Sequence, residues 1–222
     1  MQIDIPVNRI IKQFLFPLPN VSYIYIAKYI LKQLFKNLLF SDYYYILCVD
    51  LDSLRLPKAS RLTYSIGIAD KGDLESLVDR LGELEWNERK EIATRVFFAK
   101  AGFRHCYLGR AADGQPVYMQ WLIYPDENEI IAKHFRSRFY PLKPNQIMLE
   151  NAFTFPRFRG LGPLPSVSAE LLTIARDQGY KTAVAYIQKN QLVSLNEFMN
   201  MNFKIRKIVR EYKILGVTKR ML

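Results

Sequence analysis

The hydrophobic pattern changes period twice within residues 148–187. The run Met148–Phe155 is largely apolar and predicts a strand, and residues 164–178 carry apolar side chains at helical spacing. Gly179 follows the last turn of that pattern, where helices commonly end, and residues 181–187 predict a second strand. Because a strand–helix–strand crossover is normally right-handed, the two strands are expected to be parallel.

The rest of the chain also divides into strand and helix patterns. Strands are predicted at residues 43–51, 62–69, 105–110 and 116–124, helices from Asp73 onward and over residues 85–101, and one or two strands at residues 204–215. Asp113-Gly114 indicates a hairpin, and residues 126–141 are expected to form a polar or helical connection. This order predicts an α/β fold with a mixed sheet that helices cover on both faces.

Residues 1–41 differ from the rest and are interpreted as an N-terminal amphipathic extension to a domain at residues 42–222. Lys28, Lys32 and Lys36 recur at helical spacing opposite an apolar side. Lysines at every turn argue against a membrane span, and no signal-peptide cleavage site follows. The helix could pack on the domain, cover a homodimer contact or lie on an anionic membrane surface, and the sequence leaves all three open.

Length and composition agree with one folded domain. The chain has 222 residues, half of them hydrophobic, which is enough to bury a core and argues against disorder. Cys48 and Cys106 lie far apart, and the only histidines, His105 and His134, suggest no metal site. We therefore expect a reduced, metal-free protein that is cytoplasmic or peripheral to the membrane.

The net charge of +11 bears on partners rather than on fold. Coenzyme A, an acidic carrier protein, an anionic membrane and nucleic acid all fit a basic protein, although only charge supports nucleic acid. The basic residues that crowd the C-terminus are Lys204, Arg206, Lys207, Arg210, Lys213, Lys219 and Arg220. These residues form either a solvated face or a binding surface.

A basic loop with two glycines, residues 156–162, joins the first predicted strand to the helix. Gly160 and Gly162 lack a Cβ atom, so the backbone can turn tightly and approach a ligand closely. The first N–H groups of a helix have no partner within it and attract anions. Arg157 and Arg159 add donors suited to phosphate oxygens. The loop is therefore a candidate phosphate site, although short glycine patterns also occur by chance.

This loop and the residues after it resemble the GNAT N-acyltransferase superfamily. The resemblance consists of Arg-x-x-Gly-x-Gly, a Gly-Tyr-Lys turn and an Asn/Gln-x-x-Ser-x-x-x-aromatic helix that ends in Asn-Phe. The matching residues are Arg157, Gly160, Gly162, Gly179, Tyr180, Lys181, Gln191, Ser194, Phe198, Asn202 and Phe203. The resemblance is specific over residues 150–203 and looser over residues 60–213. It implies a mixed, mostly antiparallel GNAT-like sheet and an acyl-coenzyme A co-substrate, acetyl-coenzyme A in the simplest case.

The resemblance also implies where the co-substrate binds. The pyrophosphate would lie on the loop and the pantetheine arm along the strand before it. The backbone near residues 152–154 would supply an N–H donor for the oxyanion, and a bulge there would free that donor. The co-substrate residues assigned in this way are Ala152, Phe153, Thr154, Arg157, Phe158, Arg159, Gly160, Leu161, Gly162, Leu164, Asn190, Gln191, Ser194 and Phe198.

Glu150 is the candidate catalytic base. In a regular strand it shares a face with Ala152 and Thr154, while Leu149 and Phe153 occupy the other face. A carboxylate on a central strand is costly to bury, and burial raises its pKa toward the range of a working base. The alternative is a glutamate in a structural ion pair.

Phe198 departs from the family pattern. The family often has a tyrosine there that protonates the leaving thiolate, and phenylalanine cannot donate a proton. A thiolate can leave without help near neutral pH, because an unperturbed thiol has a pKa of about 8.5. Tyr186 or Tyr212 could also replace the missing acid.

The loop and the last helix carry two further departures. Gln191 stands where asparagine is common, and the neighbouring Asn190 could take its role. Pro163 and Pro165 each remove a backbone donor close to the loop, although proline is tolerated in a first helical turn. The grip on a phosphate is therefore expected to be weaker or differently shaped.

Two functions fit these observations. The first is an N-acyltransferase that moves an acyl group from acyl-coenzyme A to a primary amine of a small molecule or peptide, or takes a long acyl chain from a carrier protein. The second is a non-catalytic module that binds acyl-coenzyme A or docks on a membrane. Glu150 and the two loop glycines favour the first function, and Phe198 with the prolines favours the second.

Overall fold

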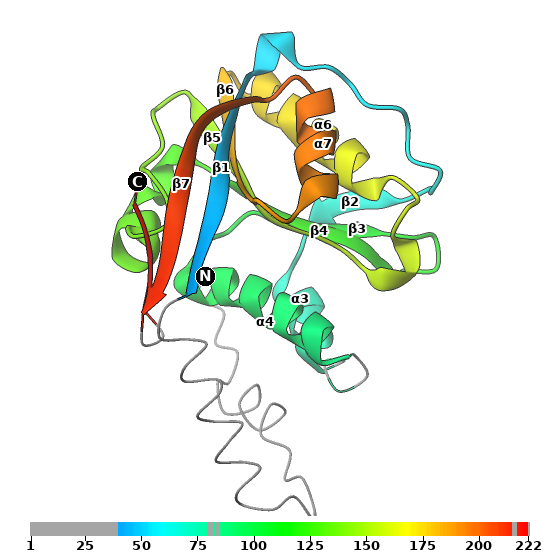
Figure 1. Ribbon diagram of the computed structural model, residues 1–222. Coiled ribbons are helices and arrows are strands. Elements are labelled where there is room, and N and C mark those ends of the chain that lie inside the picture. The colour runs from blue at the N-terminus through cyan, green and yellow to red at the C-terminus, as the bar shows by residue number, and fades with distance from the viewer. Residues whose placement is uncertain (1–39, 80–81, 83–84, 215–216, 222) are drawn as a thin grey trace, which may run out of the picture.

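The computed structural model describes residues 40–79, 82, 85–214 and 217–221 (Figure 1). The predicted N-terminal helix lies outside these residues, so its packing, dimer and membrane alternatives stay predictions. The elements in chain order are β1 (Phe40–Asp50), η1 (Leu51–Ser53), β2 (Ser65–Ile68), α3 (Lys71–Asp79), α4 (Trp86–Ala101), β3 (Cys106–Arg110), β4 (Pro116–Ile123), η3 (Pro125–Glu127), α5 (Asn128–Ile130), η4 (Ile131–Phe135), β5 (Gln146–Thr154), η5 (Pro156–Phe158), α6 (Pro163–Asp177), β6 (Thr182–Gln188), α7 (Leu192–Asn200), β7 (Lys204–Ile214) and β8 (Val217–Arg220).

The described strands form one mixed sheet in the order β2-β3-β4-β5-β6-β1-β7-β8. β5 and β6 are parallel, as expected for the strands of the predicted crossover, and each other pair of neighbours is antiparallel. The prediction of a mixed, mostly antiparallel sheet is therefore confirmed.

β1, the first strand that the structure describes, lies in the interior of this sheet. β1 pairs with β6 on one side and with β7 on the other, so Tyr44 lies opposite both Gln188 and Val209. Its residues Ile46 and Leu47 are buried in the core. The chain order of the elements does not reveal this position, because the partners of β1 come more than 130 residues later.

Helices cover both faces of the sheet, as predicted. The Tyr118 and Gln120 side chains of β4 reach Ser168 of α6 on one face. Trp121, the next residue, packs against Phe98 of α4 on the other. Alternate residues of a strand point to opposite faces, so β4 is buried on both sides by helices.

β5 and β6 separate part of the way along their length (Figure 1). Their parallel ladder runs from Gln146 opposite Thr182 to Leu149 opposite Ala185. Both strands continue past this point, but residues 150–154 and 186–188 are not paired with each other. The edge of β5 that faces β6 is therefore open in the middle of the sheet.

Two predicted elements differ in detail, whereas residues 126–141 contain short helical turns that fit the predicted polar or helical connection, among them the π-helical turn η4. The second strand is shorter than predicted, Ser65–Ile68 in place of residues 62–69. The cap of α3 is Asp70 rather than Asp73. The Asp73 amide donates to Asp70 Oδ1 at 2.8 Å, and the Asp70 amide donates to Asp73 Oδ2 at 2.9 Å. This reciprocal pair satisfies two donors that the helix itself cannot.

The reciprocal cap makes α3 depend on Asp70. We expect Asp70→Ala to lower the free energy of unfolding by about 1 kcal/mol, because the Asp73 amide loses its acceptor. Ser76→Ala, at an exposed position of the same helix, serves as the control and should be neutral or slightly stabilising. Equilibrium unfolding in urea measures both variants, and equal losses would contradict the cap assignment.

Candidate active site

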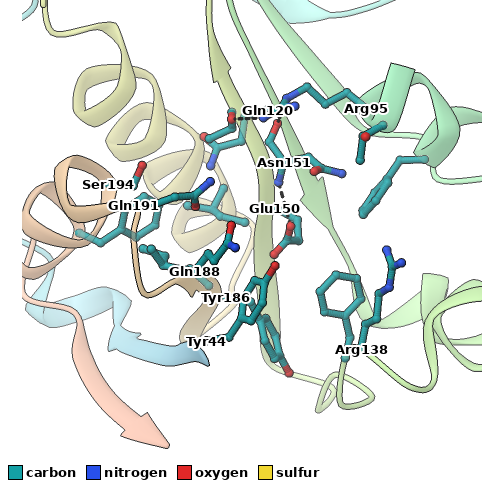
Figure 2. A pocket seen from close by; sticks show the side chains of 18 of the residues that line it. Tyr44, Arg95, Gln120, Arg138, Glu150, Asn151, Tyr186, Gln188, Gln191 and Ser194 are labelled. Carbon is teal, nitrogen blue, oxygen red and sulfur yellow. Dashed lines mark hydrogen bonds between the residues drawn. The ribbon is translucent and has the colours of Figure 1, made fainter. Parts of the chain in front are cut away.

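A cavity of about 230 Å³ lies where β5 and β6 separate (Figure 2). Its walls come from α4, β5, β6 and α7, closed by side chains from β1, β8 and the turn after η4. Its lining residues include Tyr44, Glu91, Arg95, Phe98, Gln120, Arg138, Phe139, Leu149, Glu150, Asn151, Ala152, Tyr186, Gln191, Ser194, Phe198 and Arg220. The cavity therefore joins segments from almost the whole described chain.

A β-bulge in β5 forms one wall of the cavity. Trp121 lies opposite Glu150 and Met119 opposite Phe153, so two residues of β5, Asn151 and Ala152, face one position of β4. Asn151 has a φ of +53°. Asparagine adopts this left-handed region more readily than most residues, which suits it to a bulge.

Arg95 of α4 holds the bulge in place. Its guanidinium donates to the carbonyl oxygens of Asn151 at 3.1 Å and Ala152 at 2.7 Å, and to the Glu91 carboxylate at 2.7 Å. The side chain is 6% exposed and lies 4.7 Å from the Phe153 ring centroid. Because C=O and N–H point in opposite directions across a trans peptide, the amides of Ala152 and Phe153 point away from Arg95.

The bulge changes which residues share a face with Glu150. Residues opposite each other in an antiparallel pair lie on the same face, so Glu150 and Phe153 both share the face of Trp121 and α4. The prediction that Glu150 lies with Thr154, opposite Phe153, is wrong, because the extra residue shifts the alternation by one. Thr154 instead lies opposite Tyr118, on the α6 face.

The Glu150 carboxylate faces the cavity among several cations (Figure 2). Burial raises its pKa to about 7, an effect that Arg220, the Asn151 amide, Arg95 and Arg138 oppose. The Asn151 amide donates to Oε2 at 3.0 Å. Among the residues that the structure describes, no arginine or lysine forms a salt bridge with Glu150 within 4.0 Å, so the carboxylate is not neutralised by a direct ion pair.

The glycine loop leaves several backbone donors free. Gly160 and Gly162 have φ of +79° and +84°, which glycine adopts without strain. The amides of Gly160, Gly162 and Leu164 form no backbone hydrogen bond with the described part of the chain. Ser60 and Arg61 hold the loop by donating to the Leu161 carbonyl oxygen, each at 3.0 Å.

Arg157 and Arg159 make contacts within the protein that the sequence did not predict. Arg157 donates to the Gln115 side chain at 2.9 Å, and Arg159 donates to the Thr154 carbonyl oxygen at 3.3 Å. Arg159 also lies 4.0 Å from Glu88. Both side chains are exposed, so these contacts leave most of each guanidinium accessible to solvent.

The structure brings part of the predicted site together. The cavity is lined by Glu150 and by four of the predicted co-substrate residues: Ala152, Gln191, Ser194 and Phe198. Arg157 and Phe158 line a separate pocket beside α4, of about 260 Å³. The remaining predicted residues, which do not line the cavity, are Phe153, Thr154, Arg159, Gly160, Leu161, Gly162, Leu164 and Asn190. The loop residues among them follow β5 directly and lead into α6.

Phe198, which cannot donate a proton, and Tyr186, one of the two tyrosines that could replace the missing acid, both lie at the cavity. Phe198 lines it and packs edge-on against Phe203, with ring centroids 4.9 Å apart. Tyr186 also lines it, and its hydroxyl accepts the Tyr140 amide at 3.0 Å. Burial raises the pKa of Tyr186 to about 12. Tyr212 does not line the cavity and lies instead beside Arg210.

Several cavity residues were not predicted from the sequence. Arg95 and Arg138 belong to no sequence motif. Tyr44 lies on β1, whose neighbouring strands the sequence does not specify. Arg220 was placed in a basic C-terminal surface, but it is 8% exposed and donates to Glu211 at 2.7 Å. The sequence around Arg220 contains no feature that predicts burial of this side chain.

Metal sites and membrane spans are both missing from the described residues. Within residues 40–221, as far as they are described, no group of three or more histidine, cysteine, aspartate or glutamate side chains is arranged to hold a metal ion. The same residues contain no helix with the length and apolar character needed to cross a membrane.

Solved structures share this architecture. A GCN5-related glucosamine N-acetyltransferase region of a fungal multi-domain GH3 β-N-acetylglucosaminidase aligns with a TM-score of 0.59 at 10% identity, over 92% of this chain and 24% of that one. A Drosophila protein aligns with a TM-score of 0.55 at 11% identity, over 90% of this chain and 60% of that one. This chain thus spans less than two thirds of either neighbour.

Comparison of the amino-acid sequence, in contrast to that of the structure, finds no relative. No protein-family model matches it, and no curated protein matches it. At identities of 10–11%, the structural likeness establishes the fold alone. The chain has the fold of the GCN5-related N-acetyltransferases, the GNAT fold.

Proposed function

We propose that the protein is an N-acyltransferase that moves an acyl group, in the simplest case acetyl, from acyl-coenzyme A to a primary amine. The observation that carries this proposal is the bulge in β5, which brings Glu150 and the Ala152 backbone to one cavity at the open edge of the strand. The fold supports it at a coarse level, because neighbours with this fold include an N-acetyltransferase.

The glycine loop is the proposed pyrophosphate site. Its three free amides lie at the start of α6, where backbone N–H groups and the helix dipole both favour an anion. Pro163 and Pro165 supply no donors there, so the amides of Gly160, Gly162 and Leu164 would carry the contact. The pantetheine arm would then run along the open edge of β5 toward the cavity.

The transfer needs one bond formed and one broken. The amine lone pair attacks the thioester carbonyl carbon, a C–N bond forms, and the oxyanion collapses to expel coenzyme A as a thiolate. Glu150 accepts the proton that the amine loses, and an amide of the bulge, that of Ala152 in our proposal, donates to the oxyanion. The thiolate takes its proton from water or from Tyr186.

A non-catalytic acyl-coenzyme A-binding module is the second candidate. Phe198 favours it, because this residue lines the cavity and cannot donate a proton to a leaving thiolate. A long acyl chain delivered by an acidic carrier protein is a variant of the first candidate that the basic charge of the chain favours. Thiol release in the presence of amines separates an enzyme from a binding module.

The loop assignment predicts which glycine controls coenzyme A binding. We expect coenzyme A at 100 times its Kd to stabilise the protein by about 2.7 kcal/mol. Gly160→Val should abolish the resulting rise in Tm, because a branched side chain would disturb a backbone at φ +79° that must contact phosphate. Thermal unfolding with and without coenzyme A, acetyl-coenzyme A and a long-chain acyl-coenzyme A measures the effect.

Gly179→Val is the matched control for this experiment. Gly179 has a φ of +94° and, like Gly160, has no atom within 4 Å of where a Cβ would lie, but it follows the opposite end of α6. Both variants should unfold at lower temperature in the absence of ligand, and only Gly179→Val should keep the coenzyme A response. No Tm shift of the wild type with any of the three compounds would remove the proposal in its coenzyme A form.

The base assignment predicts a pH dependence. Glu150 must be deprotonated to accept a proton, so kcat/KM should fall as the pH drops through about 7, the pKa that burial gives this residue. Glu150→Gln should lower kcat/KM at pH 8 roughly 100-fold and remove this inflection. Release of coenzyme A thiol, followed across the pH range, checks both expectations.

Glu129→Gln, at an exposed position outside the cavity, should leave the profile unchanged. Deprotonation of the amine substrate also raises kcat/KM as the pH increases. This effect is the same in the wild type and both variants, so it cancels when their pH profiles are compared. Retention of the inflection near pH 7 in Glu150→Gln would exclude Glu150 as the base.

A further inference from the structure

Three arginines of the described chain line the cavity, and the guanidinium groups of two of them are hydrogen-bonded to other residues of the protein. Arg95 donates to two backbone carbonyls and to Glu91. Arg220 donates to Glu211 at 2.7 Å and to the Arg138 carbonyl oxygen at 3.0 Å, and its guanidinium stacks 3.7 Å from the Tyr44 ring centroid. These contacts fix both side chains as parts of the wall.

Arg138 is different, because its guanidinium has no hydrogen-bond or ion-pair partner within the described part of the chain. The side chain is partly buried and points into the cavity from the turn after η4 (Figure 2). Its backbone is anchored, since its amide donates to Phe135 at 2.7 Å and its carbonyl oxygen accepts from Arg220. A fixed backbone thus presents five free N–H donors to the cavity.

A second donor without a partner lies on the same cavity. Asn151 Nδ2 is buried and forms no hydrogen bond with the residues described by the structure. An unsatisfied buried donor is unfavourable unless a ligand or water completes it. The Arg138 guanidinium and Asn151 Nδ2 are both N–H donors without a partner, and converging N–H donors are the chemistry that recognises an anionic oxygen group.

The cavity also contains the opposite charge. Glu150 and Arg138 line the same space, and no salt bridge within 4.0 Å joins them. An amine arrives at neutral pH mainly as an ammonium ion, which Glu150 can receive. A molecule with a cationic and an anionic end can satisfy Glu150 and Arg138 at once, whereas a simple amine leaves Arg138 without a counter-ion.

Size and wall chemistry narrow the ligand further. A volume of about 230 Å³ lies below the range of about 300–1,000 Å³ that is usual for drug-sized ligands. Phe98, Phe139 and Leu149 supply an apolar part of the wall. The space therefore fits a small molecule with an apolar side group as well as two charged ends.

We propose that the acyl acceptor is a small amino acid whose carboxylate binds Arg138, with Asn151 as a second donor, while its amine faces Glu150. This proposal rests on the proposed acyl transfer and names the substrate class of the same site. A planar guanidinium can hold a carboxylate through two parallel hydrogen bonds, which gives orientation as well as affinity. That orientation would direct the amine toward the bulge.

Matched acceptors test the role of the carboxylate. Thiol release from acetyl-coenzyme A is measured with leucine, leucinamide and isoamylamine, which share an apolar group and differ in the carboxylate. The wild type should prefer leucine. Arg138→Met should raise the KM for leucine roughly tenfold to a hundredfold, as expected for loss of hydrogen bonds to a charged group, and leave the two amines without a carboxylate unaffected.

Two further variants separate this role from a structural one. Arg136→Met removes an exposed arginine two residues away and should change none of the three KM values. Arg138→Lys keeps the positive charge but loses the planar guanidinium and its two parallel donors. Compared with Arg138→Met, it should restore part of the preference for leucine. Loss of activity toward all three acceptors in Arg138→Met would overturn the carboxylate assignment. Phosphoethanolamine, which carries a phosphate in place of the carboxylate, is measured as a fourth acceptor, and a wild-type preference for it would also overturn the assignment.

A binding measurement keeps the proposal independent of turnover. Isothermal titration of the full chain with N-acetylleucine, the expected product, should show binding that Arg138→Met abolishes and Arg136→Met preserves. Such binding without thiol release from any amine would refute the proposed catalysis and support the carboxylate site. Turnover of leucinamide and leucine at equal KM, with no effect of Arg138→Met, would refute the carboxylate site and support the catalysis.

Discussion

The buried contact between Arg95 and the bulge of β5 determines the geometry of the cavity. A guanidinium that is 6% exposed needs compensation for lost hydration, and it finds this in two backbone carbonyls and Glu91. Burial lowers the pKa of Arg95 from its ordinary value, an effect that Glu91 opposes. The same bonds fix the direction of the two peptide groups after Asn151, so one charge–dipole contact positions the backbone of the site.

The electrostatics of the cavity follow from the uneven pairing of its charges. Arg95 and Arg220 each have a carboxylate partner, Glu91 and Glu211, outside the bulge. Glu150 has cations nearby but none in direct contact within the described chain, so burial dominates and its pKa rises to about 7. A group with this pKa exchanges protons readily near neutral pH, which a fully paired glutamate could not do.

The cavity is completed by segments that are far apart in the sequence. β1 enters the sheet between β6 and β7 and carries Tyr44, while β8 carries Arg220 onto the Tyr44 ring. Both residues thus depend on long-range strand pairing that is set by the whole sheet. This arrangement links the last residues of the described chain to its first strand and to the central cavity.

The sequence alone determined the strand–helix–strand unit, the glycine loop, the helices on both faces and the position of Glu150 on a central strand. These follow from local hydrophobic period and turn residues, which act over a few positions. The bulge, the partners of β1 and the cations Arg95, Arg138 and Arg220 were decided by tertiary structure. The pairing of β1 and the contact between Arg95 and Asn151 join residues more than 50 positions apart, and no local pattern encodes which distant carbonyl an arginine will meet.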